Sequence, residues 1–108
     1  MTDEIHPSTQ LFLDILDEMR ALSLKKQADY GRATDPFANV RAAEDFGISP
    51  WIGAAIRIND KQRRIQKAAT FGSTSLINDS LEDDFLDNAI YNVIALVMLR
   101  EETAKEQQ

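Results

Sequence analysis

A row of cations inside an acidic chain is the first feature of this sequence that could do chemistry. The segment INDKQRRIQK, residues 58–67, follows Arg57 in a chain whose formal net charge is −6. On a helix, Arg57, Lys61 and Arg64 fall on one face, because residues three and four apart are neighbours. Guanidinium forks bind phosphate oxygens bidentately and an ammonium adds a point charge, so this face predicts a phosphate site. The alternative is a solvated helix face with a local pair between Asp60 and Arg64.

An acidic stretch, NDSLEDDFLDNAIYN at residues 78–92, is the second candidate. Helical spacing places Asp83, Asp87 and Tyr91 in one row, and two carboxylates one turn apart can share a hard cation such as Mg²⁺ that bridges to a substrate phosphate. Acids in a first helical turn are also favoured by capping and by the macrodipole, which accounts for Asp83 and Asp84 without a metal. Neither capping nor the macrodipole accounts for Asp87, which lies one helical turn after these residues.

The third candidate is KKQADYGR, residues 25–32, where the first predicted helix closes. A helix C-terminus stabilises cations, so Lys25 and Lys26 have a structural explanation. Tyr30 could stack on a base or hydrogen-bond a phosphate, although a tyrosine before glycine is more often a packing anchor. We assign no role to His6, which lies in a polar segment.

The basic and acidic stretches also have an explanation in common. The helix that carries the cations and the helix that carries the acids can pair with each other, within or between subunits. The chain has no cysteine, which excludes thiol catalysis and thiolate metal sites, and it has no Gly-rich phosphate loop, nucleophile triad or zinc spacing. The sequence therefore leaves phosphate binding, a magnesium site and simple helix pairing open.

The elements that must position these residues are helices, because apolar residues recur every three or four positions without sustained alternation. A length of 108 residues predicts one domain, an all-α compact four-helix bundle, with residues 1–7 and 104–108 frayed. We expect the helices to run from a cap at Ser8 or Thr9 to near Gly31, from the Asp35 cap and Pro36 to Gly47, from the Ser49 cap and Pro50 to about Thr70, and from the Ser80 cap past Arg100.

Residues 93–99, VIALVML, are apolar on every side of the last predicted helix. A helix that is apolar all round must be buried all round, and three partners can hardly enclose it, so we expect a homodimer or larger oligomer. This run is far shorter than the ~20 residues of a membrane span, and the acidic N-terminus is unlike a signal peptide, which predicts a cytoplasmic protein without a membrane partner. The acidic charge makes duplex nucleic acid an unfavourable partner.

Three motifs together resemble a group of small all-α proteins common in phage genomes and related to the MazG-like nucleotide pyrophosphohydrolases. The group carries K-x-x-D-Y-G, then K-x-x-R-I or K-x-x-R-L, then D-x-x-x-D-x-x-x-Y. The matching residues are Lys26, Asp29, Tyr30 and Gly31; Lys61, Arg64 and Ile65; and Asp83, Asp87 and Tyr91. The resemblance covers about residues 25–100 and implies a helical oligomer that handles nucleotides, with metal-bound hydrolysis in the better-known relatives.

The sequence departs from the hydrolase pattern at the metal ligands. MazG-like enzymes resemble each other in an E-x-x-E on one helix and an E-x-x-D on a later one, which together hold Mg²⁺. Asp84 and Asp87 can stand for the second pair, but the earlier helix offers only Asp60 among several cations. Hydrolysis of a phosphoanhydride depends strongly on neutralisation by a metal, so this departure weakens the case for catalysis more than the case for binding.

We therefore expect a phage-type protein that captures a nucleotide, a cyclic nucleotide or another nucleotide-derived signal without turnover, as an anti-defence sponge would. The expected ligand-binding residues are Lys26, Tyr30, Arg57, Lys61, Arg64 and Tyr91. The first alternative is a Mg²⁺-dependent nucleotide pyrophosphohydrolase, with Asp60, Asp84 and Asp87 as metal ligands and Asp83 as a further candidate. The second is a structural or assembly protein whose charged stripes only pair between subunits.

Overall fold

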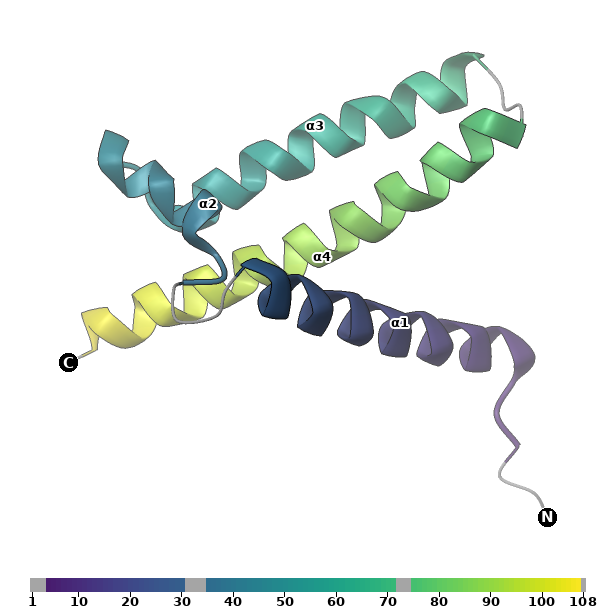
Figure 1. Ribbon diagram of the computed structural model, residues 1–108, viewed down its shortest axis with the longest axis horizontal. Helices are drawn as coiled ribbons and strands as arrows, with labels where there is room; N and C mark the ends of the chain where they lie inside the picture. The colour runs from purple at the N-terminus through teal and green to yellow at the C-terminus, as the bar shows by residue number, and fades with distance from the viewer. Residues whose placement is uncertain (1–3, 31–34, 72–74, 108) are drawn as a thin grey trace. The chain divides into compact units, whose positions relative to one another are not determined.

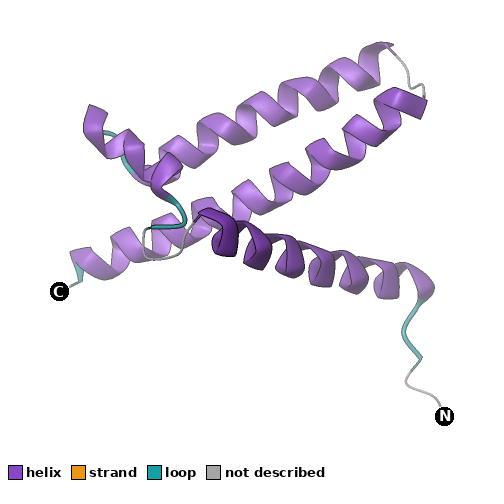
Figure 2. Ribbon diagram, in the orientation of Figure 1, coloured by secondary structure: helices purple, strands orange, loops and turns teal. Residues whose placement is uncertain are grey.

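The computed structural model describes residues 4–30, 35–71 and 75–107, and every regular element in these ranges is helical (Figure 1, Figure 2). The elements are α1 (Pro7–Tyr30), α2 (Ala38–Arg41), the 3₁₀ helix η1 (Ala42–Phe46), α3 (Pro50–Phe71) and α4 (Ser75–Glu106). The predicted all-α class is confirmed for the described residues. The chain divides into two compact units, Met1–Pro36 and Phe37–Gln108, where the sequence predicted one domain.

The first unit contains α1, and His6 caps the start of this helix. The backbone amide of Ser8 donates a hydrogen bond to Nδ1 of His6 at 3.0 Å, and the carbonyl of His6 accepts from the amide of Gln10 at 3.0 Å. Pro7 occupies the first helical position, where its missing N–H costs nothing. The expected caps at Ser8 and Thr9 are therefore wrong. The expected fraying of residues 1–7 stays a prediction.

The second unit begins with α2, which starts later than the sequence indicated. The residue before it is Phe37, whose side chain makes no capping hydrogen bond, so Asp35 and Pro36 lie ahead of the helix and do not open it. Its continuation η1 ends at Gly47 as predicted. Gly47 has φ 72°, and the amides of Gly47 and Ile48 donate to the carbonyls of Glu44 and Ala43 at 2.9 and 3.1 Å. These two bonds form a Schellman motif, which favours glycine because its φ is positive.

Helices α3 and α4 form an antiparallel hairpin, as Figure 1 shows, and this hairpin makes most of the second unit. The bounds of α3 agree with the prediction. Helix α4 begins at Ser75 and continues through Glu106, so the predicted cap at Ser80 is wrong. The expected fraying of residues 104–108 stays a prediction. Ser49 precedes α3 as expected, but its hydroxyl donates to Oε1 of Glu102 at 2.9 Å.

The core of this unit lies where α2, α3 and α4 meet. Val40, Ala54 and Met98 are buried there, with Ile94 among the partly buried residues packed against them. Gly53 allows the approach of α2 to α3, because a Cβ atom at this position would lie 2.7 Å from the carbonyl oxygen of Val40. A contact that short forces the backbone apart, so α2 can lie on α3 only at a glycine.

Within the second unit, the other elements cover only part of the apolar run at residues 93–99. Val93, Leu96 and Leu99 are 54%, 45% and 45% exposed, whereas Met98 on the opposite side is 2% exposed. The expected homodimer or larger oligomer stays a prediction. In the part of the chain that the structure describes, no helix combines the length and the apolarity that a membrane crossing requires.

Candidate functional site

The hairpin brings the cationic row of α3 against the acidic and aromatic row of α4. The guanidinium carbon of Arg57 lies 5.8 Å from the ring centroid of Tyr91. Lys61 Nζ lies 3.2 Å from Asp87 Oδ2, and Arg64 Nε lies 3.2 Å from Asp84 Oδ1. These three contacts are one continuous ladder between the two helices, which we call the charged ladder.

The two rows have the same spacing in opposite chain directions, which is what a contact between antiparallel helices requires. From Arg57 to Lys61 the chain advances four residues, and from Tyr91 to Asp87 it goes back four. The next step is three residues in each direction and ends at Arg64 and Asp84. Side chains three and four apart share a face of a helix, so two matching rows on antiparallel helices meet rung by rung.

Burial differs along the charged ladder, and this difference separates structural from accessible groups. Asp84 is 5% exposed and is the one buried charged residue in the described part of the chain. The Lys61 and Asp87 side chains are 23% and 35% exposed, and that of Arg64 is 58% exposed. A buried carboxylate must be paired or hydrogen-bonded to be tolerated, so Asp84 needs Arg64.

The residues expected to hold magnesium are not assembled as a metal site. Asp60 and Asp83 are exposed, while Asp84 and Asp87 are ion-paired with α3. Within residues 4–30, 35–71 and 75–107, no group of three or more acidic or histidine side chains is placed to hold a metal ion. A hard cation such as Mg²⁺ takes several oxygen ligands, so this donor set does not fit it in the arrangement described.

Two predicted ligand-binding residues belong to the other unit. Lys26 lies on α1 and is exposed, and Tyr30 is the last residue of that helix. The side chain of Tyr30 and the whole of Gly31 lie outside the described residues. The roles of Lys26 and Tyr30 therefore stay predictions.

A polar strip beside the charged ladder continues along α4. Nδ2 of Asn88 lies 3.5 Å from Oε1 of Gln62, at the long limit for a hydrogen bond, and Oδ1 of Asn88 is buried without a hydrogen-bond partner among the described residues. Nδ2 of Asn92 donates to the backbone carbonyl of Asn88 at 2.9 Å. Asn88 thus places an amide group on the inner side of the hairpin, next to the rung formed by Lys61 and Asp87.

A second polar cluster, which the sequence did not reveal, lies at the other end of the hairpin. Arg41 pairs with Glu101 at 2.9 Å, and Ser49 donates to Glu102 at 2.9 Å. Its members come from three separate stretches of the chain, and none of them belongs to a recognisable motif. Only the Ser49 cap position before Pro50 could have drawn attention to it.

No protein-family model, no curated protein and no solved structure matches this chain.

Proposed function

We propose that the protein binds a nucleotide or a nucleotide-derived signal on the charged ladder and captures it without turnover. The observation that carries this proposal is the guanidinium of Arg57, 5.8 Å from the centroid of the Tyr91 ring. A guanidinium over an aromatic face is held in place by cation–π attraction and still offers N–H donors to phosphate oxygens. The pair therefore presents a phosphate donor next to a ring on which a base or ribose can rest.

The next rung supplies a second positive group within reach. Lys61 is one turn along α3 from Arg57 and pairs with Asp87, and both side chains are partly exposed. Bound phosphate would compete with Asp87 for the ammonium group. A like charge next to phosphate opposes binding by ~1 kcal/mol at a few ångströms in water and more in a partly buried site. Asp87 thus limits affinity in this proposal.

Capture without turnover is proposed because the carboxylates of α4 are directed at cations. Asp84 and Asp87 each lie 3.2 Å from a positive group of α3. A metal would have to replace those contacts before it could neutralise a phosphoanhydride. In this proposal the protein is phage-encoded and removes a host nucleotide signal from the host cytoplasm, as an anti-defence protein does.

The test is a panel of nucleotides, including cyclic dinucleotides, incubated with the protein with and without Mg²⁺ and then separated from it. Mass spectrometry of the bound and free fractions distinguishes a retained, unchanged nucleotide from a cleaved one. We expect at least one member of the panel to be retained intact. Mg²⁺-dependent release of monophosphate or pyrophosphate would instead establish the pyrophosphohydrolase alternative.

A second candidate function, a structural or assembly protein, is favoured by one observation. Both charged rungs of the ladder are satisfied within the chain, while Val93, Leu96 and Leu99 stay exposed on α4. An exposed apolar surface of this kind is typical of a protein–protein contact. The absence of any retained nucleotide, together with a stable oligomer, would favour this candidate.

A further inference from the structure

Arg57 is the cation of the charged ladder that faces an aromatic ring instead of an acid. Its guanidinium carbon lies 5.8 Å from the centroid of the Tyr91 ring, whereas Lys61 and Arg64 each lie 3.2 Å from a carboxylate. Lys61 follows Arg57 by four residues, which is about 6 Å along the helix axis. One phosphate group between these two side chains can accept hydrogen bonds from both, so the bound phosphate belongs at this end of the ladder.

A longer phosphate chain has no favourable path from this position. In one direction the next two rungs bring the carboxylates of Asp87 and Asp84, which repel phosphate. In the other direction α3 and α4 run through residues 50–56 and 92–99, PWIGAAI and NVIALVML, which contain no charged residue. A second or third phosphate would therefore meet either acids or an uncharged surface.

The surface around the ladder has no excess of positive charge. In residues 57–67 of α3 and 82–91 of α4, each cation is matched by an acid. The cations are Arg57, Lys61, Arg63, Arg64 and Lys67, and the acids are Asp60, Glu82, Asp83, Asp84 and Asp87. The whole chain has a formal net charge of −6. Salt screens charges little at distances shorter than ~8 Å, so each further negative charge on a ligand is opposed here.

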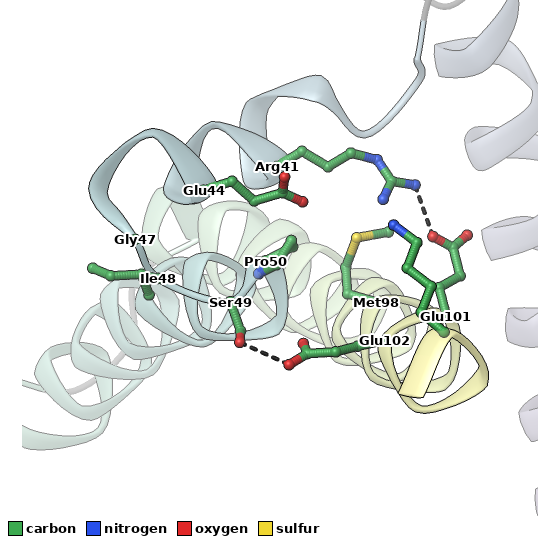
Figure 3. Close-up of a pocket in the computed structure, with 10 residues that line it drawn as sticks. Arg41, Glu44, Gly47, Ile48, Ser49, Pro50, Met98, Glu101 and Glu102 are labelled. Carbon is green, nitrogen blue, oxygen red and sulfur yellow. Dashed lines mark hydrogen bonds and ion pairs between the residues drawn. The ribbon is translucent and has the colours of Figure 1, made fainter. Parts of the chain in front are cut away.

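The cavity at the other end of the hairpin offers no better place for further phosphates. It has a volume of about 330 Å³ and lies where η1, the start of α3 and the end of α4 meet (Figure 3). Its cations are Arg41 and Lys105, and Arg41 is paired with Glu101 at 2.9 Å. Glu44 and Glu102 add two carboxylates to the lining, so the acids outnumber the cations in this cavity as well.

We infer that the charged ladder selects a nucleotide that presents a phosphodiester, as a small cyclic nucleotide does, over a nucleotide with a terminal phosphate. This inference rests on the proposed function and narrows its ligand class. A diester carries one negative charge per phosphate. A terminal monoester carries nearly two at pH 7, because its second pKa is about 6, and a triphosphate carries more. Each added charge finds no further cation at the Arg57 end and is repelled by Asp87.

The test is isothermal titration of the full chain in EDTA, at one ionic strength, with matched ligands of adenine, guanine, cytosine and uracil. Each set contains the 3′,5′-cyclic monophosphate, the 5′-monophosphate, the methyl ester of that 5′-monophosphate and the 5′-triphosphate. The methyl ester is a diester without the ring, so it separates the effect of charge from that of shape. For the base that binds, we expect both diesters to bind about fivefold more tightly than the 5′-monophosphate, the equivalent of ~1 kcal/mol for one charge. The triphosphate should bind more weakly than the 5′-monophosphate.

A variant tests the cause of this preference. Asp87→Asn removes a negative charge next to the phosphate and relieves a doubly charged phosphate more than a singly charged one. The preference for diesters over the 5′-monophosphate should therefore narrow by about twofold or more. Asp83→Asn is the matched control, because Asp83 is exposed on the same helix and the net charge changes equally, and it should leave the preference unchanged. If Asp87→Asn does not fold, the ligand series on the unaltered protein still decides.

A single-stranded tetranucleotide without terminal phosphates distinguishes a small nucleotide from a nucleic-acid strand. It is a diester too, but it brings a row of charges, so it should bind more weakly than the cyclic nucleotide. Tighter binding of the strand would overturn the inference. Equal affinities for diester and monoester, or tighter binding of the 5′-monophosphate or triphosphate, would also overturn it and leave nucleotide capture standing. If no ligand of any set binds, the proposed function fails and the inference fails with it.

Discussion

The Nε atom of Arg64 lies 3.2 Å from Oδ1 of Asp84, whose side chain is 7% exposed, so a buried carboxylate of α4 is ion-paired with a cation of α3. The side chain of Arg64 is itself 58% exposed. A phosphate ligand could meet that exposed guanidinium, but the contact with Asp84 gives Arg64 a structural role first. The two roles predict different responses to substitution.

Arg64→Ala is expected to lower the free energy of unfolding by ~1–3 kcal/mol, because it leaves a buried carboxylate without its partner. Chemical denaturation monitored by circular dichroism measures this change. Arg63→Ala is the matched control, since Arg63 is exposed on the same helix and its removal should cost less than about 0.5 kcal/mol. Asp84→Asn combined with Arg64→Ala should recover part of the loss. If the double variant is as unstable as the sum of the single variants, the ion pair does not carry the effect.

Arg57→Ala is expected to weaken nucleotide binding roughly 10- to 100-fold, because one charge-assisted bond to phosphate contributes ~1.5–3 kcal/mol. Isothermal titration with the nucleotide retained from the panel measures the Kd. Tyr91→Leu should weaken binding less, through loss of the ring that positions the guanidinium. Arg63→Ala removes the same charge from the same helix and should change the Kd less than about threefold if only the general field of the protein is altered. An equal loss of nucleotide affinity in Arg57→Ala and Arg63→Ala would argue against a defined site at the charged ladder.

The substitution Asp87→Asn has different expected effects in a nucleotide-binding protein and in a hydrolase. In a binding protein it removes a carboxylate 3.2 Å from Lys61 Nζ, and the freed ammonium should strengthen phosphate binding about fivefold, the equivalent of ~1 kcal/mol. Asp83→Asn is the control, because Asp83 is exposed on the same helix and the net charge changes equally. EDTA should leave the Kd of the unaltered protein unchanged. A hydrolase would instead lose turnover by orders of magnitude in Asp87→Asn while its affinity changed little.

Light scattering at micromolar protein concentration is expected to show a dimer or a larger assembly, because α4 leaves Val93, Leu96 and Leu99 exposed. Leu96→Asn should shift the assembly toward the monomer. Ile56→Asn is the control on α3, where a 54% exposed isoleucine lies outside the apolar run. A monomer of 12.2 kDa at all concentrations would contradict the burial argument made from residues 93–99.

The sequence by itself determined the helical class, the bounds of α3 and the end of η1. Each of these follows from local interactions. The period of three and four residues places apolar side chains on one helical face, Pro50 suits a first helical turn, and Gly47 adopts the positive φ that ends η1. None of these features depends on a distant part of the chain, so the sequence was sufficient to predict them.

The predicted starts of α2 and α4 were wrong, because a residue that can cap a helix does not by itself fix where the helix begins. Ser80 could accept a capping bond, yet α4 begins at Ser75. Asp35 could open a helix, yet the backbone turns at Pro36 and Phe37 before α2 begins. The sequence analysis assigned no role to His6, because serine and threonine are the usual capping residues. In the structure the ring nitrogen of His6 accepts the capping hydrogen bond instead.

Only the tertiary structure decided which charged groups meet. The sequence left three interpretations of the cationic and acidic rows open, and only the register of the hairpin shows which groups meet within the chain, Lys61 with Asp87 and Arg64 with Asp84. The hydrogen bond from Ser49 to Glu102 is even less predictable from the sequence, because the two residues are 53 positions apart along the chain. Contacts between such distant positions depend on how helices pack, and the local periodicity of either helix carries no information about the position of the other.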